Sequence, residues 1–154
     1  MNWDLPSPFI IEASVAAADL DELQHTNNLV YVGWCERVAW EHSNSLGLDA
    51  GKYQELDRGM AITRSEFDYL RACGEGDKVQ IATWITHCDM RLTMERRFQV
   101  VLASSGETLL RARMDFACIQ LSNGKPRRLP PEFLEGYGPA VVDASGLKPE
   151  TRES

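Results

Sequence analysis

The sequence has no long apolar run and no recognisable leader at its start. None of its hydrophobic stretches approaches the roughly 20 apolar residues that a membrane-spanning helix requires, so we expect no membrane partner. The basic and apolar regions of a secretory signal are missing from the opening residues MNWDLP, and we therefore expect a cytoplasmic protein.

Basic residues and paired cysteines are also scarce. Lys and Arg number 16 against 23 Asp and Glu, and the formal net charge is −7. We expect no nucleic-acid partner, because such partners are bound through a basic face. The four cysteines form no Cys-x-x-Cys pair and lie in apolar or strand-like stretches, so we expect reduced thiols in the core: Cys35, Cys73, Cys88 and Cys118.

The length and the apolar content fit a single globular domain. A chain of 154 residues falls in the usual size range for one domain, and its 44% of hydrophobic residues is enough to bury a core. We expect one domain over residues 1–154, with an ordered core over about 9–137. Residues 138–154, rich in Gly, Pro and charge, are expected to form a loose tail.

Hydrophobic periodicity predicts an α+β fold. Apolar residues recur at three- and four-residue steps from Asn28 to Leu46, which predicts a long helix, with Gly47 suited to its C-terminal end. The helix is apolar on several sides, so it should be wrapped by other elements. Two-residue alternation and short turns predict a five-stranded antiparallel β-sheet wrapped around this central helix, with strands over about 9–18, 60–70, 78–88, 90–102 and 110–118.

Arg96 interrupts the apolar face of the strand predicted over residues 90–102. If the side chain points inward, it needs a partner such as a carboxylate or a second subunit. A β-bulge that turns Arg96 outward is the alternative.

Polar side chains concentrate between the first strand and the helix, from Asp19 to Asn28. A helix N-terminus carries unpaired N–H groups and partial positive charge, which favour an anion or a developing oxyanion. A nearby aspartate, ordinarily ionised at neutral pH, can act as base or nucleophile toward a carbonyl carbon. Asp21 is the candidate, although aspartates here also serve as turn formers and Asn27 as a helix cap.

The motif Asp19-x-Asp21-x-x-Gln24-His25-x-Asn27-Asn28-x-x-Tyr31 resembles that of the hotdog-fold acyl-CoA thioesterases. The similarity is greatest to the 4-hydroxybenzoyl-CoA thioesterase and YbgC-like branch, and in element order it covers about residues 9–137. Gln24 stands where that family usually has Gly. If this glycine takes a positive φ, Gln24 is either strained or part of a redrawn loop.

The resemblance implies a reaction and a role for each residue of the motif. Asp21 matches the catalytic carboxylate, and Asn28 matches the residue whose backbone N–H binds the thioester carbonyl. His25 and Asn27 match residues that shape and line the site. The resemblance also implies an acyl-CoA substrate with no cofactor besides its coenzyme A, and a homodimer or homotetramer with sites at the subunit interface.

Other functions stay open on the residues alone. A non-catalytic acyl-binding hotdog protein would keep the fold. An acyl-thioester dehydratase or hydratase is less well supported, because the His-Phe-Pro-Gly and Asp-x-Asn-Pro-x-His settings of those enzymes are missing. We expect no metal, because the candidate ligands Asp19, Asp21, Glu22 and His25 crowd one short loop.

Coenzyme A carries phosphates, which Lys and Arg side chains bind. Three groups of basic residues are available for this, and none is assigned as a site: Arg91 with Arg97, Arg111 with Arg113, and Lys125 with Arg127 and Arg128.

Overall fold

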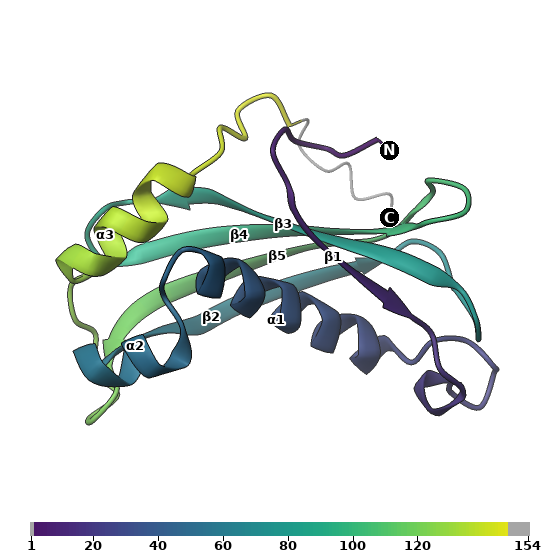
Figure 1. Ribbon diagram of the computed structural model, residues 1–154, viewed down its shortest axis with the longest axis horizontal. Coiled ribbons are helices and arrows are strands. Elements are labelled where there is room, and N and C mark those ends of the chain that lie inside the picture. The colour runs from purple at the N-terminus through teal and green to yellow at the C-terminus, as the bar shows by residue number, and fades with distance from the viewer. Residues whose placement is uncertain (1, 148–154) are drawn as a thin grey trace.

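The computed structural model describes residues 2–147, which form one antiparallel sheet of five strands with an 18-residue helix lying across it (Figure 1). The strands are β1 (Phe9–Ser14), β2 (Arg58–Tyr69), β3 (Lys78–Cys88), β4 (Thr93–Leu102) and β5 (Thr108–Gln120). The helices are α1 (Asn28–Ser45), α2 (Ala50–Leu56) and α3 (Pro131–Tyr137), with 3-10 turns η1 (Ala17–Asp19) and η2 (Gly138–Ala140). The strand order is β1-β3-β4-β5-β2.

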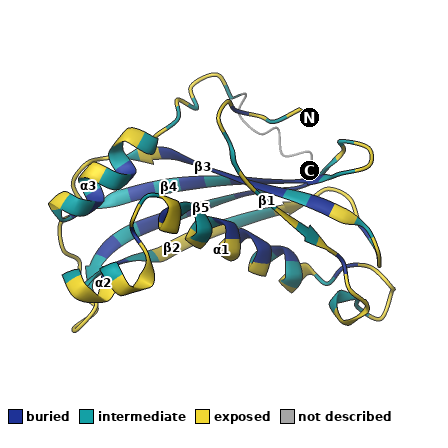
Figure 2. Cartoon of the chain, viewed as in Figure 1, coloured by how far each residue is buried: buried dark blue, intermediate teal, exposed yellow. Residues whose placement is uncertain are grey.

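The core lies between α1 and one face of the sheet. Alternate residues of β5 are buried, from Leu110 through Met114 to Cys118, and the residues between them are more exposed. Four apolar residues of α1 pack into the same cluster: Tyr31, Trp34, Cys35 and Val38. Figure 2 shows this as dark blue segments along α1 and the strands behind it. As predicted, Gly47 ends the α1 region with a φ of 80°.

β2 and β3 follow each other in the chain but are not neighbours in the sheet. The short turn between them predicts a hairpin, and this prediction is wrong: β2 pairs with β5, and β3 pairs with β1 and β4. The connecting segment crosses the end of the sheet. At its start the Leu70 N–H donates to the Leu109 carbonyl oxygen, and near its end the Gly76 N–H donates to the Val15 carbonyl oxygen. β2 is therefore an edge strand, with Ile62 and Tyr69 exposed along it.

Two strands are shorter than their alternation predicts. The first ends at Ser14 instead of residue 18, because residues 17–19 form η1. The strand predicted from Met90 begins at Thr93, because the Asp89 carboxylate accepts backbone N–H bonds from residues 91–93 and Met90 takes a φ of 60°. A side chain that bonds to nearby backbone in this way replaces strand pairing with a turn.

The prediction of a loose tail over residues 138–154 is wrong for the described part of the segment after α3. The Val142 N–H donates to the Ile85 carbonyl oxygen at 2.8 Å. Val142, Ala144 and Leu147 then pack on a second, smaller cluster built around Leu5 and Trp84. Scattered apolar residues without periodicity are enough for this, because they only cover an existing face of β3. The rest of the predicted tail, residues 148–154, lies outside the described residues.

All four cysteines are free, and Cys35, Cys73 and Cys118 are buried, as the sequence predicts. No helix within residues 2–147 is both long and apolar enough to cross a membrane.

Candidate active site

The polar stretch before α1 folds as a three-residue hairpin loop. Leu20 pairs with Thr26 across an antiparallel bridge, and the Asp21 N–H donates to the His25 carbonyl oxygen at 2.7 Å. Within the loop, the Gln24 N–H donates to the Asp21 carbonyl oxygen at 3.1 Å. This geometry corresponds to a tight turn followed by one residue in the left-handed region, a common way to close a three-residue hairpin.

Gln24 is that left-handed residue, with a φ of 62°. The positive φ inferred from the family's glycine is therefore confirmed, and the loop has not changed to a conformation with a negative φ at this position. Glycine takes this conformation freely, whereas the Cβ of any other residue crowds its own backbone. The Gln24 side chain is exposed and makes no hydrogen bond to the described residues, so no side-chain contact offsets the strain.

The loop holds the Asp21 carboxylate through one of its two oxygens. Asp21 Oδ1 accepts hydrogen bonds from the backbone N–H groups of Leu23 at 2.8 Å and His25 at 3.2 Å. Oδ2 accepts none from residues 2–147. The carboxylate is thus fixed in orientation, partly exposed, and left with one oxygen available to a substrate or a water molecule. His25 acts here through its backbone, and its side chain is exposed.

The N-terminus of α1 follows directly and is capped as predicted. The Asn27 side-chain oxygen accepts a hydrogen bond from the Leu29 N–H at 2.9 Å. The N–H of Asn28, the first residue of the helix, has no acceptor in the described part of the chain. An unpaired N–H at this end of a helix favours an oxygen that carries or develops negative charge.

Buried contacts fix this corner to the connection between β2 and β3. The Thr26 N–H and hydroxyl both donate to the Cys73 carbonyl oxygen, at 2.8 and 2.9 Å. The Tyr31 hydroxyl lies 3.2 Å from the Cys73 thiol. Burial, followed by the neighbouring Cys73, raises the pKa of Tyr31, so its hydroxyl stays protonated and serves as a structural contact. The loop and the helix N-terminus are therefore held in one geometry.

A cavity of about 130 Å³ lies near the other end of α1. Its apolar wall comes from helix α1 and from β2, β4 and β5, and includes Trp40, Met60, Ile62, Met94, Met114 and Phe116. Five polar side chains also line it: Glu36, Ser43, Tyr53, Arg96 and Tyr137. Asn28 and Ser43 are fifteen residues apart on α1, which corresponds to about 22 Å along the helix axis.

Arg96 points inward and is 1% exposed, and neutral groups surround it. Its guanidinium bonds to His42 Nδ1 at 2.9 Å, to the Ser43 hydroxyl at 3.2 Å and to the Thr83 hydroxyl at 3.4 Å. Of the two possibilities that the sequence left open, the inward one is correct. A carboxylate, one of the two partners suggested for an inward Arg96, is absent among the described residues, none of which forms an ion pair with Arg96.

The contact with Arg96 also determines the protonation state of His42. A guanidinium only donates hydrogen bonds, so His42 Nδ1 must accept and carry no proton. Burial, followed by the charge of Arg96, lowers the pKa of His42 to about 4. Burial likewise lowers the pKa of Arg96 to about 10, which leaves the guanidinium charged at neutral pH. Arg96 therefore contributes a cation to the cavity wall, and His42, which contacts Arg96 but does not line the cavity, carries no charge.

Two tyrosines complete this polar group. The Tyr137 hydroxyl hydrogen-bonds to the hydroxyls of both Ser43, at 2.9 Å, and Tyr53. Burial, followed by Tyr137, raises the pKa of Tyr53 and keeps its hydroxyl neutral. The sequence offered one signal for the group, the arginine on an apolar strand face, and none for its partners on α1, α2 and α3.

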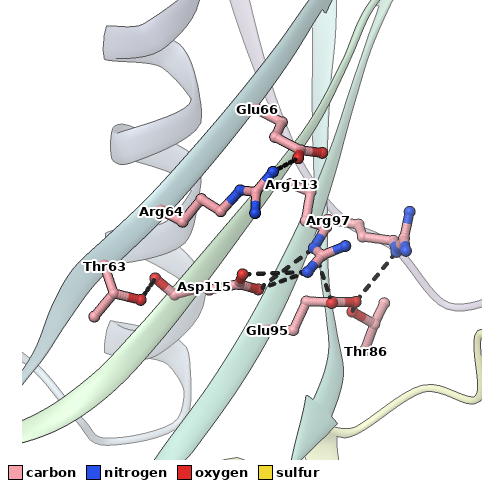
Figure 3. A network of polar contacts seen from close by, with 8 residues as sticks. All are labelled: Thr63, Arg64, Glu66, Thr86, Glu95, Arg97, Arg113 and Asp115. Carbon is pink, nitrogen blue, oxygen red and sulfur yellow. Dashed lines mark hydrogen bonds and ion pairs between the residues drawn. The ribbon is translucent and has the colours of Figure 1, made fainter. Parts of the chain in front are cut away.

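Several of the basic residues considered for phosphate binding are held in ion pairs on the outer face of the sheet. Arg97 and Arg113 both contact Glu95, at 3.3 and 3.0 Å, and Arg113 also contacts Asp115 (Figure 3). Arg111 pairs with Asp4 at 2.8 Å. Arg91, Lys125, Arg127 and Arg128 are exposed. No three potential metal ligands converge anywhere in residues 2–147.

Comparison with known proteins identifies similarities over most of the chain. A family model described as the thioesterase-like superfamily matches residues 15–136. No curated protein sequence gives a significant match.

Solved structures of low sequence identity share the fold over most of the chain. A 1,4-dihydroxy-2-naphthoyl-CoA thioesterase from Synechocystis aligns with a TM-score of 0.76 and 20% identity, over 86% of this chain and 96% of that one. A hypothetical protein from Staphylococcus aureus, in complex with CoA, aligns with a TM-score of 0.84 and 15% identity, over 97% and 94%. A 12:0-ACP thioesterase from Umbellularia californica aligns with a TM-score of 0.79 and 21% identity, over 92% of this chain but 56% of that one.

Proposed function

The chain belongs to the thioesterase-like superfamily, and from this we propose that it hydrolyses an acyl-CoA thioester to coenzyme A and a carboxylic acid. We propose that residues 1–154 form one such domain and that the reaction needs no cofactor beyond the coenzyme A of the substrate. The observation that carries the proposal is the Asp21 loop. It holds a carboxylate with one unbonded oxygen directly before a helix whose first N–H is unpaired.

In the proposed reaction, the thioester carbonyl oxygen accepts a hydrogen bond from the Asn28 N–H. Negative charge that develops on this oxygen is stabilised by that bond and by the dipole of α1. Asp21 either removes a proton from the attacking water or attacks the carbonyl carbon itself. In both routes the C–S bond breaks, the coenzyme A sulfur leaves as a thiolate and is protonated, and water supplies the oxygen of the acid. Asn27 and His25 contribute by fixing the helix start and the loop.

The acyl group of the substrate requires a pocket, and in one chain the cavity extends along α1 from Glu36, about 12 Å from Asn28, to Ser43, about 22 Å from Asn28. We propose a homodimer, or a homotetramer built from such dimers, in which two copies of β2 pair antiparallel. Met60 and Ile62 of β2 line the cavity, while Tyr69 at the other end of β2 contacts Tyr31 near the Asp21 loop. Antiparallel pairing therefore brings the loop of one copy to the cavity of the other.

The test is release of free thiol from a panel of acyl-CoAs of varied chain length and aromaticity, with Asp21→Asn and Asp19→Asn compared. Asparagine keeps an acceptor oxygen for the loop N–H groups but is neither a base nor a nucleophile. We expect Asp21→Asn to lower kcat by on the order of 10²-fold or more, with the melting temperature nearly unchanged.

Asp19→Asn is the matched control. Asp19 lies in the same stretch, and its carboxylate accepts a hydrogen bond from the Ala16 N–H at 2.8 Å, which is a structural role. We expect this variant to retain most of the activity. Equal activity of Asp21→Asn and the wild-type protein would refute the assignment of Asp21.

A further inference from the structure

Arg96 is a buried cation whose partners are all neutral. The cavity beside it contains no carboxylate near the guanidinium: Glu36, the acidic residue of the wall, is exposed and lies seven residues before Ser43, about 10 Å along α1. A charge inside a protein is costly unless an opposite charge compensates it. The cavity is thus polarised, with positive charge at its inner end, and with mainly apolar walls and the exposed Glu36 between that end and the surface.

The shape of the cavity limits what can enter. Its volume of about 130 Å³ is close to that of the ~150 Å³ cavity that binds benzene, so the part of a ligand that it encloses is about the size of one aromatic ring or a short acyl chain. Trp40 and Ile62 line the cavity and are themselves 44% and 45% exposed, which identifies the side on which it opens. Methionines at positions 60, 94 and 114 give the wall an adaptable apolar surface.

We propose that this cavity binds the acyl part of the substrate, and that Arg96 selects an acyl group ending in a carboxylate. The substrate class is then the mono-CoA thioester of a short dicarboxylic acid, with the free carboxylate on Arg96 and the methylene chain against the apolar wall. The Ser43, Tyr53 and Tyr137 hydroxyls are joined by two hydrogen bonds, which leaves one of their three O–H groups to donate to the same carboxylate. The proposal rests on the proposed thioesterase function and on the pairing of two copies.

The test compares glutaryl-CoA with 5-methylhexanoyl-CoA, in which an isopropyl group of similar shape replaces the carboxylate. We expect the wild-type kcat/KM to favour glutaryl-CoA. In Arg96→Met the preference should fall by roughly 10²-fold, because one partner of a desolvated charge pair is lost. Hydrolysis of 5-methylhexanoyl-CoA should persist, since the variant keeps Asp21 and the apolar wall. Arg96→Lys, which keeps the charge, should retain part of the preference.

Arg97→Met is the matched control, because Arg97 is the next residue of β4 but points to the outer face, where it pairs with Glu95. It should keep the full preference for glutaryl-CoA. Equal wild-type efficiency on the two substrates, or an unchanged preference in Arg96→Met, would overturn the role of Arg96 while leaving the thioesterase assignment intact.

A binding measurement separates failure of this proposal from failure of the proposed function. Calorimetric titration of both acyl-CoAs into Asp21→Asn protein reports the preference without turnover. If no acyl-CoA is hydrolysed by the wild-type protein, the thioesterase proposal fails, and with it the substrate role of Arg96. In that case, tighter binding of glutaryl-CoA than of 5-methylhexanoyl-CoA, together with loss of this difference in Arg96→Met, would still identify a carboxylate-binding cavity. Equal binding of the two acyl-CoAs would exclude a carboxylate-binding cavity as well.

Discussion

Replacing Gln24 with glycine tests whether the loop that holds Asp21 stores backbone strain. At its φ of 62°, a non-glycine residue is expected to cost about 1–2 kcal/mol relative to an unstrained conformation. Glycine removes this cost but raises the conformational entropy of the unfolded chain, which offsets about 0.5–1 kcal/mol. The exposed Gln24 side chain makes no hydrogen bond to the described residues, so its loss adds nothing further.

The net expectation for Gln24→Gly is a free energy of unfolding that is unchanged or higher by about 1 kcal/mol. For a chain of this size that corresponds to a rise in melting temperature of about 0–4 °C, measurable by calorimetry or by circular dichroism. Glu22→Gly is the matched control in the same loop. Glu22 is exposed and has no positive φ, so glycine there relieves no strain and should lower the melting temperature by a few degrees.

The difference in melting temperature between the two variants shows whether the backbone at residue 24 is strained. If Gln24→Gly lowers the melting temperature as much as Glu22→Gly does, residue 24 is not strained in solution. The loop would then differ from the hairpin described above, and the assignment of the Asn28 N–H as the oxyanion donor would need revision. Thiol release by Gln24→Gly should be close to wild type, because the backbone bonds that hold Asp21 are unchanged.

Three further outcomes are expected. Light scattering should give a mass of at least two chains, because β2 is an exposed edge; a single-chain mass at every concentration would contradict the pairing through β2. Asn27→Ala should lower the free energy of unfolding by about 1 kcal/mol through loss of the α1 cap, and an unchanged value in denaturant titration would count against that cap. The folded-state pKa of His42, about 4, lies below its ordinary value of 6.5. Between these two pH values the unfolded chain binds more protons than the folded one, so the free energy of unfolding should fall as the pH drops from 6.5 to 4. His42→Asn, which keeps an acceptor near Arg96, should reduce that pH dependence, and an identical dependence in both proteins would exclude His42 as its source.

The sequence alone was sufficient for features that depend on neighbouring residues. The cap at Asn27, the left-handed residue at position 47 and the apolar face of α1 all follow from contacts within a few positions of the chain. The left-handed conformation of Gln24 is also local, because the turn and the hairpin that require it span only residues 20–26. The family motif lies in this same short stretch, which is why the resemblance could be found from one sequence.

The tertiary structure decided which distant segments meet. Alternation identified the strands, but it carries no information on partners, so the pairing of β2 with β5 instead of β3 could not be predicted. The same holds for Arg96: its inward orientation was one of two possibilities, and its contacts come from residues 42, 43 and 83 on other elements. Whether a buried cation has a compensating charge depends on packing among segments far apart in the chain. The cavity and its polarity therefore exist only in the folded molecule, whereas the loop that carries Asp21 is already specified by its own sequence.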